Sequence, residues 1–249
     1  GAGLIAAAAM AVSLPQIYYA QEIRMYVFVM PFVLISTDAL FAALTSGRKT
    51  WWAVHMAANL LLVFTHLFSV FFLAAQGLYL AAYRTRRTWI PWGIAHGLIL
   101  LGLAGWLFSA DAEEIRGATS WLVRPGWREA AVALLVFAGG RPANENPSSH
   151  LASGFSLDMA LAALVFGAIA WYLCRTAVAR NRCARTCTGV RGANARLPFI
   201  LLWFAVPVLG LFAASWLWRP CFMPRYVLYA SLPVYLLLGA AVDAIPRRW

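Results

Sequence analysis

The chain has 249 residues, of which 63% are hydrophobic and 12% charged, and it contains 12 Trp. A water-soluble domain of this length would expose far more charge, so the composition excludes one and indicates a polytopic membrane protein. The net charge of +11 does not indicate a nucleic-acid partner, because the basic residues lie in short loops between apolar runs, where orientation signals belong.

Eight apolar segments follow one another along the chain. Each is expected to be a helix, because an unpaired backbone amide in lipid costs several kcal/mol and the runs are too long for barrel strands. The pair 52–65 and 67–83 is compatible with two short helices that meet at residues 65–67 or with one bent element. The predicted fold is all-α, a transmembrane bundle of about eight spans. The segments are 1–14, 26–44, 52–65, 67–83, 90–108, 155–174, 197–218 and 226–245.

Both ends of the chain suggest a piece of a longer protein. Residues 1–6 resemble the middle of a helix and lack both an initiator Met and a basic leader, so they are not read as a signal peptide. The chain also stops abruptly at Trp249. We therefore expect a single transmembrane domain over 1–249 that forms the C-terminal part of a longer membrane domain.

Orientation follows from the Lys and Arg content of alternate loops. Thirteen basic residues fall in one set of loops and seven in the other, and only the second set is interspersed with acidic residues. The positive-inside rule places the first set in the cytoplasm and the second outside. The inner set is Arg48, Lys49, Arg84, Arg86, Arg87, Arg175, Arg180, Arg182, Arg185, Arg191, Arg196, Arg247 and Arg248. The outer set is Arg24, Arg116, Arg124, Arg128, Arg141, Arg219 and Arg225.

The connection 109–154 is the only sizeable non-membrane piece, and this orientation puts it outside. Its middle, 127–138, is apolar after Arg128 and Glu129, and turn residues bracket it. This pattern predicts a short helix that lies in the membrane interface.

A first polar cluster opens the second apolar segment with Glu22, Arg24 and Tyr26. A carboxylate and a guanidinium at the mouth of a span are expensive there, which favours a functional role. Arg24 can pair bidentately with a phosphate, and Tyr26 can donate a hydrogen bond to it. The alternative is structural: Arg24 pairs with Glu22 and extends to the interface, and Tyr26 belongs to the aromatic belt.

A second cluster, Arg225 and Tyr226, opens the last apolar segment and has the same two interpretations. Pro220 and Pro224 make its approach rigid, which suits a fixed site better than a loose anchor. If both clusters lie on the outer side, they frame an anionic site. His66, at an external helix junction, is either a packing residue, a metal ligand or a phosphate donor.

Other polar residues receive structural interpretations. Asp38 is expected to pair within the bundle. Asp158 is expected to cap a helix N-terminus together with Ser153 and Ser156. Hydrogen bonds between helices are expected from His55, Asn59 and His96. Cys183 and Cys187 lack nearby His or acidic ligands, so all four cysteines are expected to be unpaired thiols and no metal site is predicted.

Several short motifs occur in an order that resembles a known family. They are SLP at 13–15, YYAQEIRMY at 18–26, WW at 51–52, FTH at 64–66 and PRY at 224–226 followed by Pro233. This series is similar to the bacterial members of the protein O-mannosyltransferase type of integral-membrane glycosyltransferases. Those members carry a "P…YxQExRxY" segment, a "W…YTHY"-like helix and a late "PRY…P" span. The chain departs from that pattern at Leu67, where relatives often have Tyr.

The resemblance implies a fold of the C superfamily of glycosyltransferases. Such enzymes take a sugar, mannose or similar, from a polyprenyl-phosphate carrier in the outer leaflet, here of a bacterial plasma membrane, and pass it to an acceptor. It implies that Glu22, Arg24, Tyr26, His66, Arg225 and Tyr226 line the substrate cavity. The family's catalytic acid lies in an earlier external loop, so the catalytic residue is expected upstream of Gly1, and a divalent cation is a possible cofactor by resemblance alone.

Two other classes compete with this interpretation. A polysaccharide polymerase or ligase also handles polyprenyl-linked sugars with outer Arg and His residues, but it usually has a larger outer loop. A transporter or structural membrane subunit predicts charged or broken-helix groups near mid-membrane, whereas most ionisable residues here crowd the outer ends of the segments. The acceptor, whether protein, lipid or glycan, is not encoded in any of these motifs.

Overall fold

The computed structural model describes residues 1–22, 24–109, 122–141, 155–186 and 196–245. In these ranges the regular elements are ten α-helices and two 3-10 helices, without a strand. The predicted all-α class is therefore confirmed. Most of the connection 109–154, both cysteines of the 183–187 pair and the C-terminal Arg247 and Arg248 lie outside what the structure describes in full.

Five of these helices are long and apolar enough to cross a membrane, or six if the bent pair near the N-terminus counts as one span. The chain is therefore a multi-pass integral membrane protein. The five are Tyr26–Ser46, Arg86–Trp106, Leu157–Ala179, Arg196–Leu217 and Pro224–Asp243, and the bent pair is Ala2–Ala11 with Leu14–Gln21.

Contacts between residues divide the chain into two compact units. Unit 1 comprises Gly1–Glu22, Gly126–Phe204 and Met223–Trp249, and unit 2 comprises Ile23–Pro125 and Ala205–Phe222. Helix α11 (Arg196–Leu217) contributes to both units. The units are described separately below.

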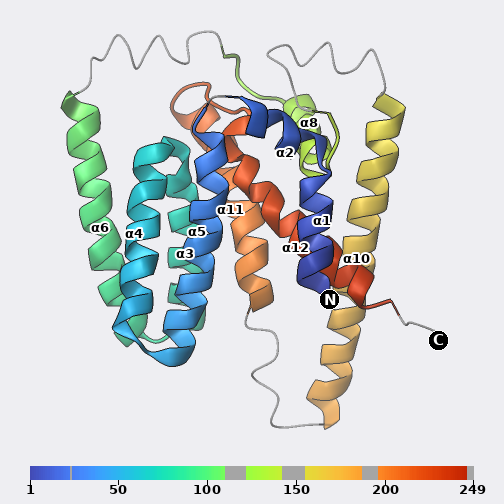
Figure 1. Cartoon of the computed structure of the whole chain (residues 1–249), viewed down its shortest axis with the longest axis horizontal. Coiled ribbons are helices and arrows are strands. Elements are labelled where there is room, and N and C mark those ends of the chain that lie inside the picture. The colour runs from blue at the N-terminus through green and yellow to red at the C-terminus, as the bar shows by residue number, and fades with distance from the viewer. Residues whose placement is uncertain (23, 110–121, 142–154, 187–195, 246–249) are drawn as a thin grey trace. The chain divides into compact units, whose positions relative to one another are not determined.

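Unit 2 is built from successive helices that alternate in direction (Figure 1). They are α3 (Tyr26–Ser46), α4 (Lys49–Thr65), α5 (Val70–Tyr83) and α6 (Arg86–Ser109). The turn between α3 and α4 is tight because Gly47 adopts the left-handed conformation (φ 67°) that ends a helix at little cost for glycine.

At His66 the chain breaks between two separate helices, α4 and α5. His66 is extended (φ −149°, ψ 109°), and a single 3-10 turn, η1 (Leu67–Ser69), leads into α5. Of the two possibilities that the sequence left open here, the structure therefore shows two short helices.

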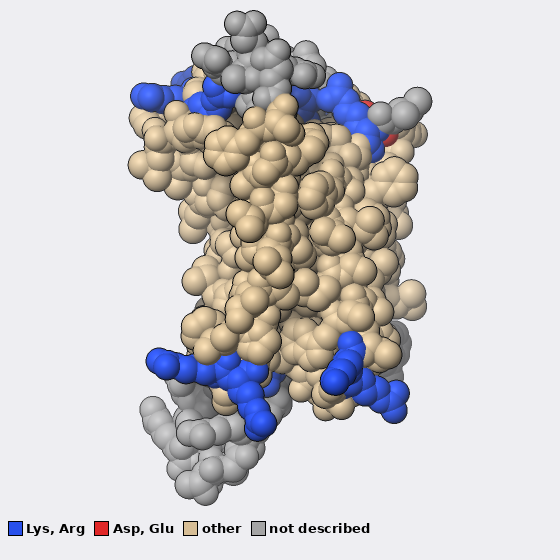
Figure 2. All heavy atoms as spheres, turned by 90° about the vertical axis from the view of Figure 1, so that its left-hand side faces the viewer, with Lys and Arg blue, Asp and Glu red and all other residues tan. Residues whose placement is uncertain are grey.

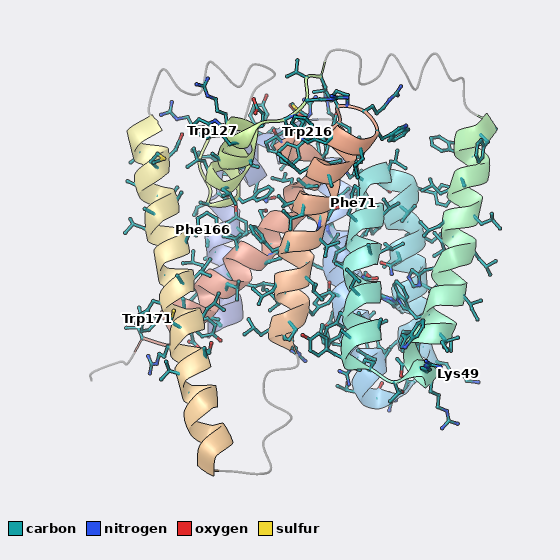
Figure 3. All side chains as sticks on the ribbon, turned by 180° about the vertical axis from the view of Figure 1, so that it is seen from behind. Lys49, Phe71, Trp127, Phe166, Trp171 and Trp216 are labelled. Carbon is teal, nitrogen blue, oxygen red and sulfur yellow. The ribbon has the colours of Figure 1, made fainter. Side chains whose placement is uncertain are left out.

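Basic residues lie at the ends of the unit 2 helices. Arg48 and Lys49 occupy the α3–α4 turn, and Arg84, Arg86 and Arg87 occupy the α5–α6 turn at the same end (Figure 1). Lys49 and Trp216 mark opposite ends of this unit (Figure 3). On the face that Figure 2 shows, Lys and Arg gather at both ends and a broad uncharged band separates them. This distribution agrees with helices that cross a membrane.

Unit 1 is held together by close helix packing. Helix α1 (Ala2–Ala11) lies along α12 (Leu232–Asp243), and a Cβ added at Gly239 would come within 2.5 Å of the Ala2 carbonyl oxygen and 3.0 Å of Ala6. Small residues that let backbones approach are the usual means of packing helices in lipid. The unit also contains α2 (Leu14–Gln21), which bends from α1 by 58°, and the long helix α10 (Phe155–Thr186).

The last span begins with a 3-10 helix. The sequence predicts an apolar helical segment over 226–245, but η2 (Pro224–Ser231) is 3-10 and only α12 is α-helical. Val227 has non-helical angles (φ −119°, ψ 24°), so the chain kinks inside this segment. Seven of the eight η2 residues are buried.

The short helix predicted at 127–138 is confirmed as α8 (Trp127–Phe137). The Glu129 carboxylate accepts a hydrogen bond from the Gly126 backbone N–H (2.7 Å), which closes the first turn. Its buried side packs against η2 and α10, so this helix rests on protein along one face. Its position in the interface stays a prediction.

The sequence interpretation of Asp38 was wrong, and that of Asp158 stays a prediction. Asp38 does not pair within the bundle; its side chain is exposed on α3, because Ser36 rather than Asp38 occupies the inner face. Asp158 lies in the first turn of α10 and pairs with Arg141 (Oδ2 to Nε, 3.7 Å). Its capping of α10 together with Ser153 and Ser156 is not tested, since Ser153 lies outside the described residues.

Candidate functional site

The six predicted site residues are distributed over both units. Glu22, Arg225 and Tyr226 belong to unit 1, and Arg24, Tyr26 and His66 belong to unit 2. Arg24 is exposed and Glu22 is half-buried. The other four occupy the ends of helices, as the sequence predicted.

Tyr26 and His66 lie together, although 40 residues separate them. Tyr26 begins α3 and His66 follows α4, so the antiparallel pair brings them to the same end, opposite Arg48 and Lys49. Their ring centroids are 5.8 Å apart with the planes at 71°, and both side chains are buried (3% and 4% exposed). Edge-to-face contact of this kind favours a fixed ring orientation.

The backbone around His66 fixes its position further. Its N–H donates to the Leu62 carbonyl (2.9 Å), and its carbonyl accepts from the Ser69 N–H (3.0 Å). The ring also contacts Phe68 at 5.8 Å between centroids. The packing role proposed for His66 is thus present. Among the described residues no group of three or more His, Cys, Asp or Glu is suitable for a metal ion, so the metal-ligand alternative gains no support.

Arg225 is a buried cation at the beginning of a candidate span. It is 8% exposed and lies in η2 directly after Pro224, which occupies the first position of that helix. Its guanidinium carbon lies 5.4 Å from the centroid of the Tyr226 ring, a cation–π distance. A buried arginine in an apolar segment needs an anion or an aromatic face, and Tyr226 supplies such a face here.

A polar seam joins the N-terminal helices to η2 and α12. The Ser13 and Tyr235 hydroxyls are 2.6 Å apart, and the Gln16 side-chain amide donates to the Ser231 hydroxyl (2.9 Å). This seam fixes the segment that carries Arg225. These four residues were not predicted, since single Ser, Gln and Tyr residues in helices give no signal of which face they occupy.

A second polar group lies in the middle of unit 2, and we call it the central polar layer. It joins side chains from α3, α4, α5 and α6, near the middle of each helix. Five of its six members are at most 2% exposed. Its members are Ser36, His55, Asn59, Gln76, Trp92 and His96.

Asn59 is the centre of this layer. Its amide nitrogen lies 2.7 Å from His96 Nε2, 2.9 Å from Gln76 Oε1 and 3.2 Å from His55 Nε2. Its amide oxygen accepts from the Ser36 hydroxyl at 2.6 Å. The predicted hydrogen bonds between helices through His55, Asn59 and His96 are therefore confirmed. Ser36, Gln76 and Trp92 were not predicted; Gln76, a lone amide in an apolar run, was the one available signal.

The cysteines in the described residues are free thiols, with Cys174 exposed and Cys221 buried. The Cys221 sulfur lies 3.4 Å from the Ser215 hydroxyl, which also accepts the Cys221 backbone N–H (3.2 Å). The expectation of unpaired thiols is confirmed for these two.

Comparison of the chain with protein-family models, with curated proteins and with solved structures finds no match.

Proposed function

We propose that this chain is part of a membrane glycosyltransferase that moves mannose or a similar sugar from a polyprenyl-phosphate carrier to an acceptor at the outer membrane face. The observation that carries the proposal is the buried Arg225 at the beginning of a candidate span, stacked on Tyr226. The leaving group in such a transfer is a phosphate that gains negative charge as the glycosidic bond breaks. A fixed guanidinium stabilises that charge without reorganising during the reaction.

The Tyr26–His66 pair gives further support. Both residues are potential hydrogen-bond donors, and both are held at the end of unit 2 opposite the Arg48–Lys49 turn. A polyprenyl-phosphate headgroup lies at the membrane surface, and its lipid tail enters between helices. Donors at helix ends are placed at the depth that such a headgroup requires.

We also propose that α4 and the η1–α5 segment cross the membrane, which gives about eight spans. The support is the alternation of the unit 2 helices and the basic turns at one end. Cysteines introduced at Lys49 and Leu67, which flank α4, in a chain without Cys174, test this with a membrane-impermeant maleimide. In intact cells only the second should react, and reaction at position 49 would contradict the orientation.

Conservative substitution of the arginines tests the function. Arg225→Lys keeps the charge but loses the bidentate fork, and losing one charge-assisted hydrogen bond costs about 1.5–3 kcal/mol. We expect transfer from a radiolabelled polyprenyl-phosphate sugar to fall about ten- to a hundred-fold in membranes that contain the full-length protein, and Arg24→Lys to act similarly. The matched control is Arg128→Lys, whose guanidinium stacks on the exposed Trp127.

Equal abundance of each variant in the membrane is checked by quantitative blotting. If Arg225→Lys and Arg24→Lys both retain wild-type transfer, the phosphate-binding proposal fails and these residues are interface anchors.

A transporter is the second candidate, because the central polar layer places two histidines near the middle of unit 2. Polar groups at this depth are typical of ion and substrate pathways. Proteoliposomes that hold the purified protein separate the two candidates. Sugar transfer to an added acceptor without any solute flux favours the enzyme, and proton flux without transfer favours the transporter.

A further inference from the structure

The hydrogen bonds of the central polar layer define the protonation state of both histidines. Each Nδ1 lies 2.9 Å from a backbone carbonyl oxygen, that of Ser36 for His55 and that of Trp92 for His96. A carbonyl oxygen can only accept, so both Nδ1 atoms carry the proton. The Trp92 indole N–H, which can only donate, points at His55 Nε2 (3.0 Å). His55 Nε2 therefore accepts and its ring is neutral. With the Asn59 amide nitrogen toward it (2.7 Å), His96 Nε2 also accepts, and that ring is neutral too.

The two amides are consistent with this neutral state. Asn59 donates to His96 Nε2 and to Gln76 Oε1, and it accepts from the Ser36 hydroxyl. The Gln76 amide nitrogen donates to the Ser36 hydroxyl oxygen (2.9 Å) and, at 3.4 Å, to Asn59 Oδ1. Every polar side chain of the layer thus has a partner.

The same positions allow a second arrangement. If the amides of Asn59 and Gln76 both rotate by 180°, each oxygen exchanges place with its nitrogen. Asn59 Oδ1 then faces His96 and Gln76, and each can donate to it. The Asn59 nitrogen donates to Ser36, whose hydroxyl in turn donates to Gln76. All five contacts of these amides with His96, with Ser36 and with each other still join a donor to an acceptor, provided that His96 Nε2 carries a proton.

We propose that the central polar layer is a proton-binding site, in which His96 Nε2 takes up one proton and the Asn59 and Gln76 amides reverse together to accommodate it. No helix has to move. The contact between Asn59 and His55 (3.2 Å) would then join two acceptors, so the neutral arrangement is the resting one. The proposal is independent of sugar transfer.

His96 rather than His55 holds the proton because its surroundings differ. The Trp92 ring stacks on the His96 ring with centroids 4.0 Å apart and planes at 20°, which stabilises an imidazolium by a cation–π contact. Trp52 meets His55 edge-on instead, at 5.9 Å and 79°. His55 Nε2 also accepts a hydrogen bond from the Trp92 indole N–H, which, unlike an amide, has no acceptor atom to exchange for its donor.

The other charged and titratable groups of the surrounding helices lie away from the layer, so His55 and His96 are the groups in it that can take up a proton. On α3, Asp38 is exposed. On α5, Tyr79 is buried and lies beneath the Arg84 guanidinium (5.9 Å), toward the end of the helix. Lys49 of α4 and Arg86 and Arg87 of α6 occupy the first helical turns. Among the residues that the structure describes, no carboxylate forms a hydrogen bond or ion pair with the layer.

Nitrogen-15 NMR of histidine-labelled full chain in micelles tests the proposal. The sequence has four histidines, and single His→Gln variants assign their signals. At alkaline pH, His55 and His96 should both appear as neutral Nδ1–H rings. As the pH falls, His96 alone of this pair should become an imidazolium while the helical circular dichroism is unchanged. If His96 stays neutral until helix is lost, the proposal is overturned.

A matched pair of variants fixes the position of the proton. In His55→Gln the imidazolium signal of His96 should persist, and in His96→Gln the remaining histidine of the layer, His55, should take up no proton before unfolding. Protonation of His55 in the second variant would contradict the assignment. Asn59→Asp, which offers only acceptors, should raise the proton affinity of His96 at least about ten-fold; an unchanged affinity in a folded Asn59→Asp protein would also overturn the proposal.

Discussion

The two units solve the same packing problem in different ways. Helices gain little from burying apolar side chains against each other in lipid, since lipid tails are equally apolar. Unit 2 joins four helices through polar side chains at their centre, whereas unit 1 brings α1 and α12 together through small residues and keeps its polar seam near the helix ends. Specificity thus comes from hydrogen bonding in unit 2 and from close backbone approach in unit 1.

The largest effect should come from breaking the central polar layer. Asn59→Leu removes the partner of His96 Nε2, of the Ser36 hydroxyl and of the Gln76 carbonyl, and each buried group left unpaired costs about 1–3 kcal/mol. Unfolding in mixed micelles by added SDS, followed by circular dichroism, measures this loss. Thr45→Leu, an exposed site on α3, is the control. A loss no larger than the control's would mean that packing, not polarity, joins unit 2.

The second effect concerns the close approach in unit 1. Gly239→Leu inserts a side chain where a Cβ already meets the Ala2 backbone, and such overpacking costs about 1–3 kcal/mol or more. The same SDS titration should show α1 released, and a protease site introduced before Ala2 should become more accessible. Gly167→Leu on α10 is the matched control, because no atom lies within 4 Å of its added Cβ. Equal stability of the two variants would remove the basis of the comparison.

The smallest effect concerns the seam. Tyr235→Phe removes one hydroxyl from the 2.6 Å contact with Ser13, and hydrogen bonds between membrane helices average about 0.6 kcal/mol. Ser13→Ala should cost a similar amount in the SDS titration, and the double variant should lose little more than either single one. Additive losses would show that the two hydroxyls act separately. Tyr18→Phe, on an exposed ring, serves as the control.

Much of the fold could be predicted from the sequence, because a bilayer permits few alternatives for long apolar runs. The helices and the hydrogen bonds of His55, Asn59 and His96 followed from apolar length and from rare polar residues within it, whereas the sequence left the form of the junction at His66 open. The 3-10 form of η2 did not, since tertiary packing rather than local preference decides it.

The candidate site was only partly predictable, for the same reason. The meeting of Tyr26 with His66 needed only an antiparallel pair of helices, which the loop length implies. The inner position of Ser36 and the outer position of Asp38 depend instead on how α3 is rotated about its axis, and a helix that is apolar all round gives no sign of that rotation.

The exposed Asp38 has a consequence for how this chain enters the membrane. Helix α3 is apolar enough to cross a membrane, yet it carries a carboxylate near its midpoint. An aspartate at that depth adds about 2.5–3.5 kcal/mol to insertion through a translocon. When α3 leaves the ribosome, α4 to α6 have not been synthesised, so Ser36 also lacks its partners. Because His55 and Asn59 of α4 are the first of these partners to be synthesised, we expect α3 and α4 to leave the translocon together, as a hairpin closed at Gly47.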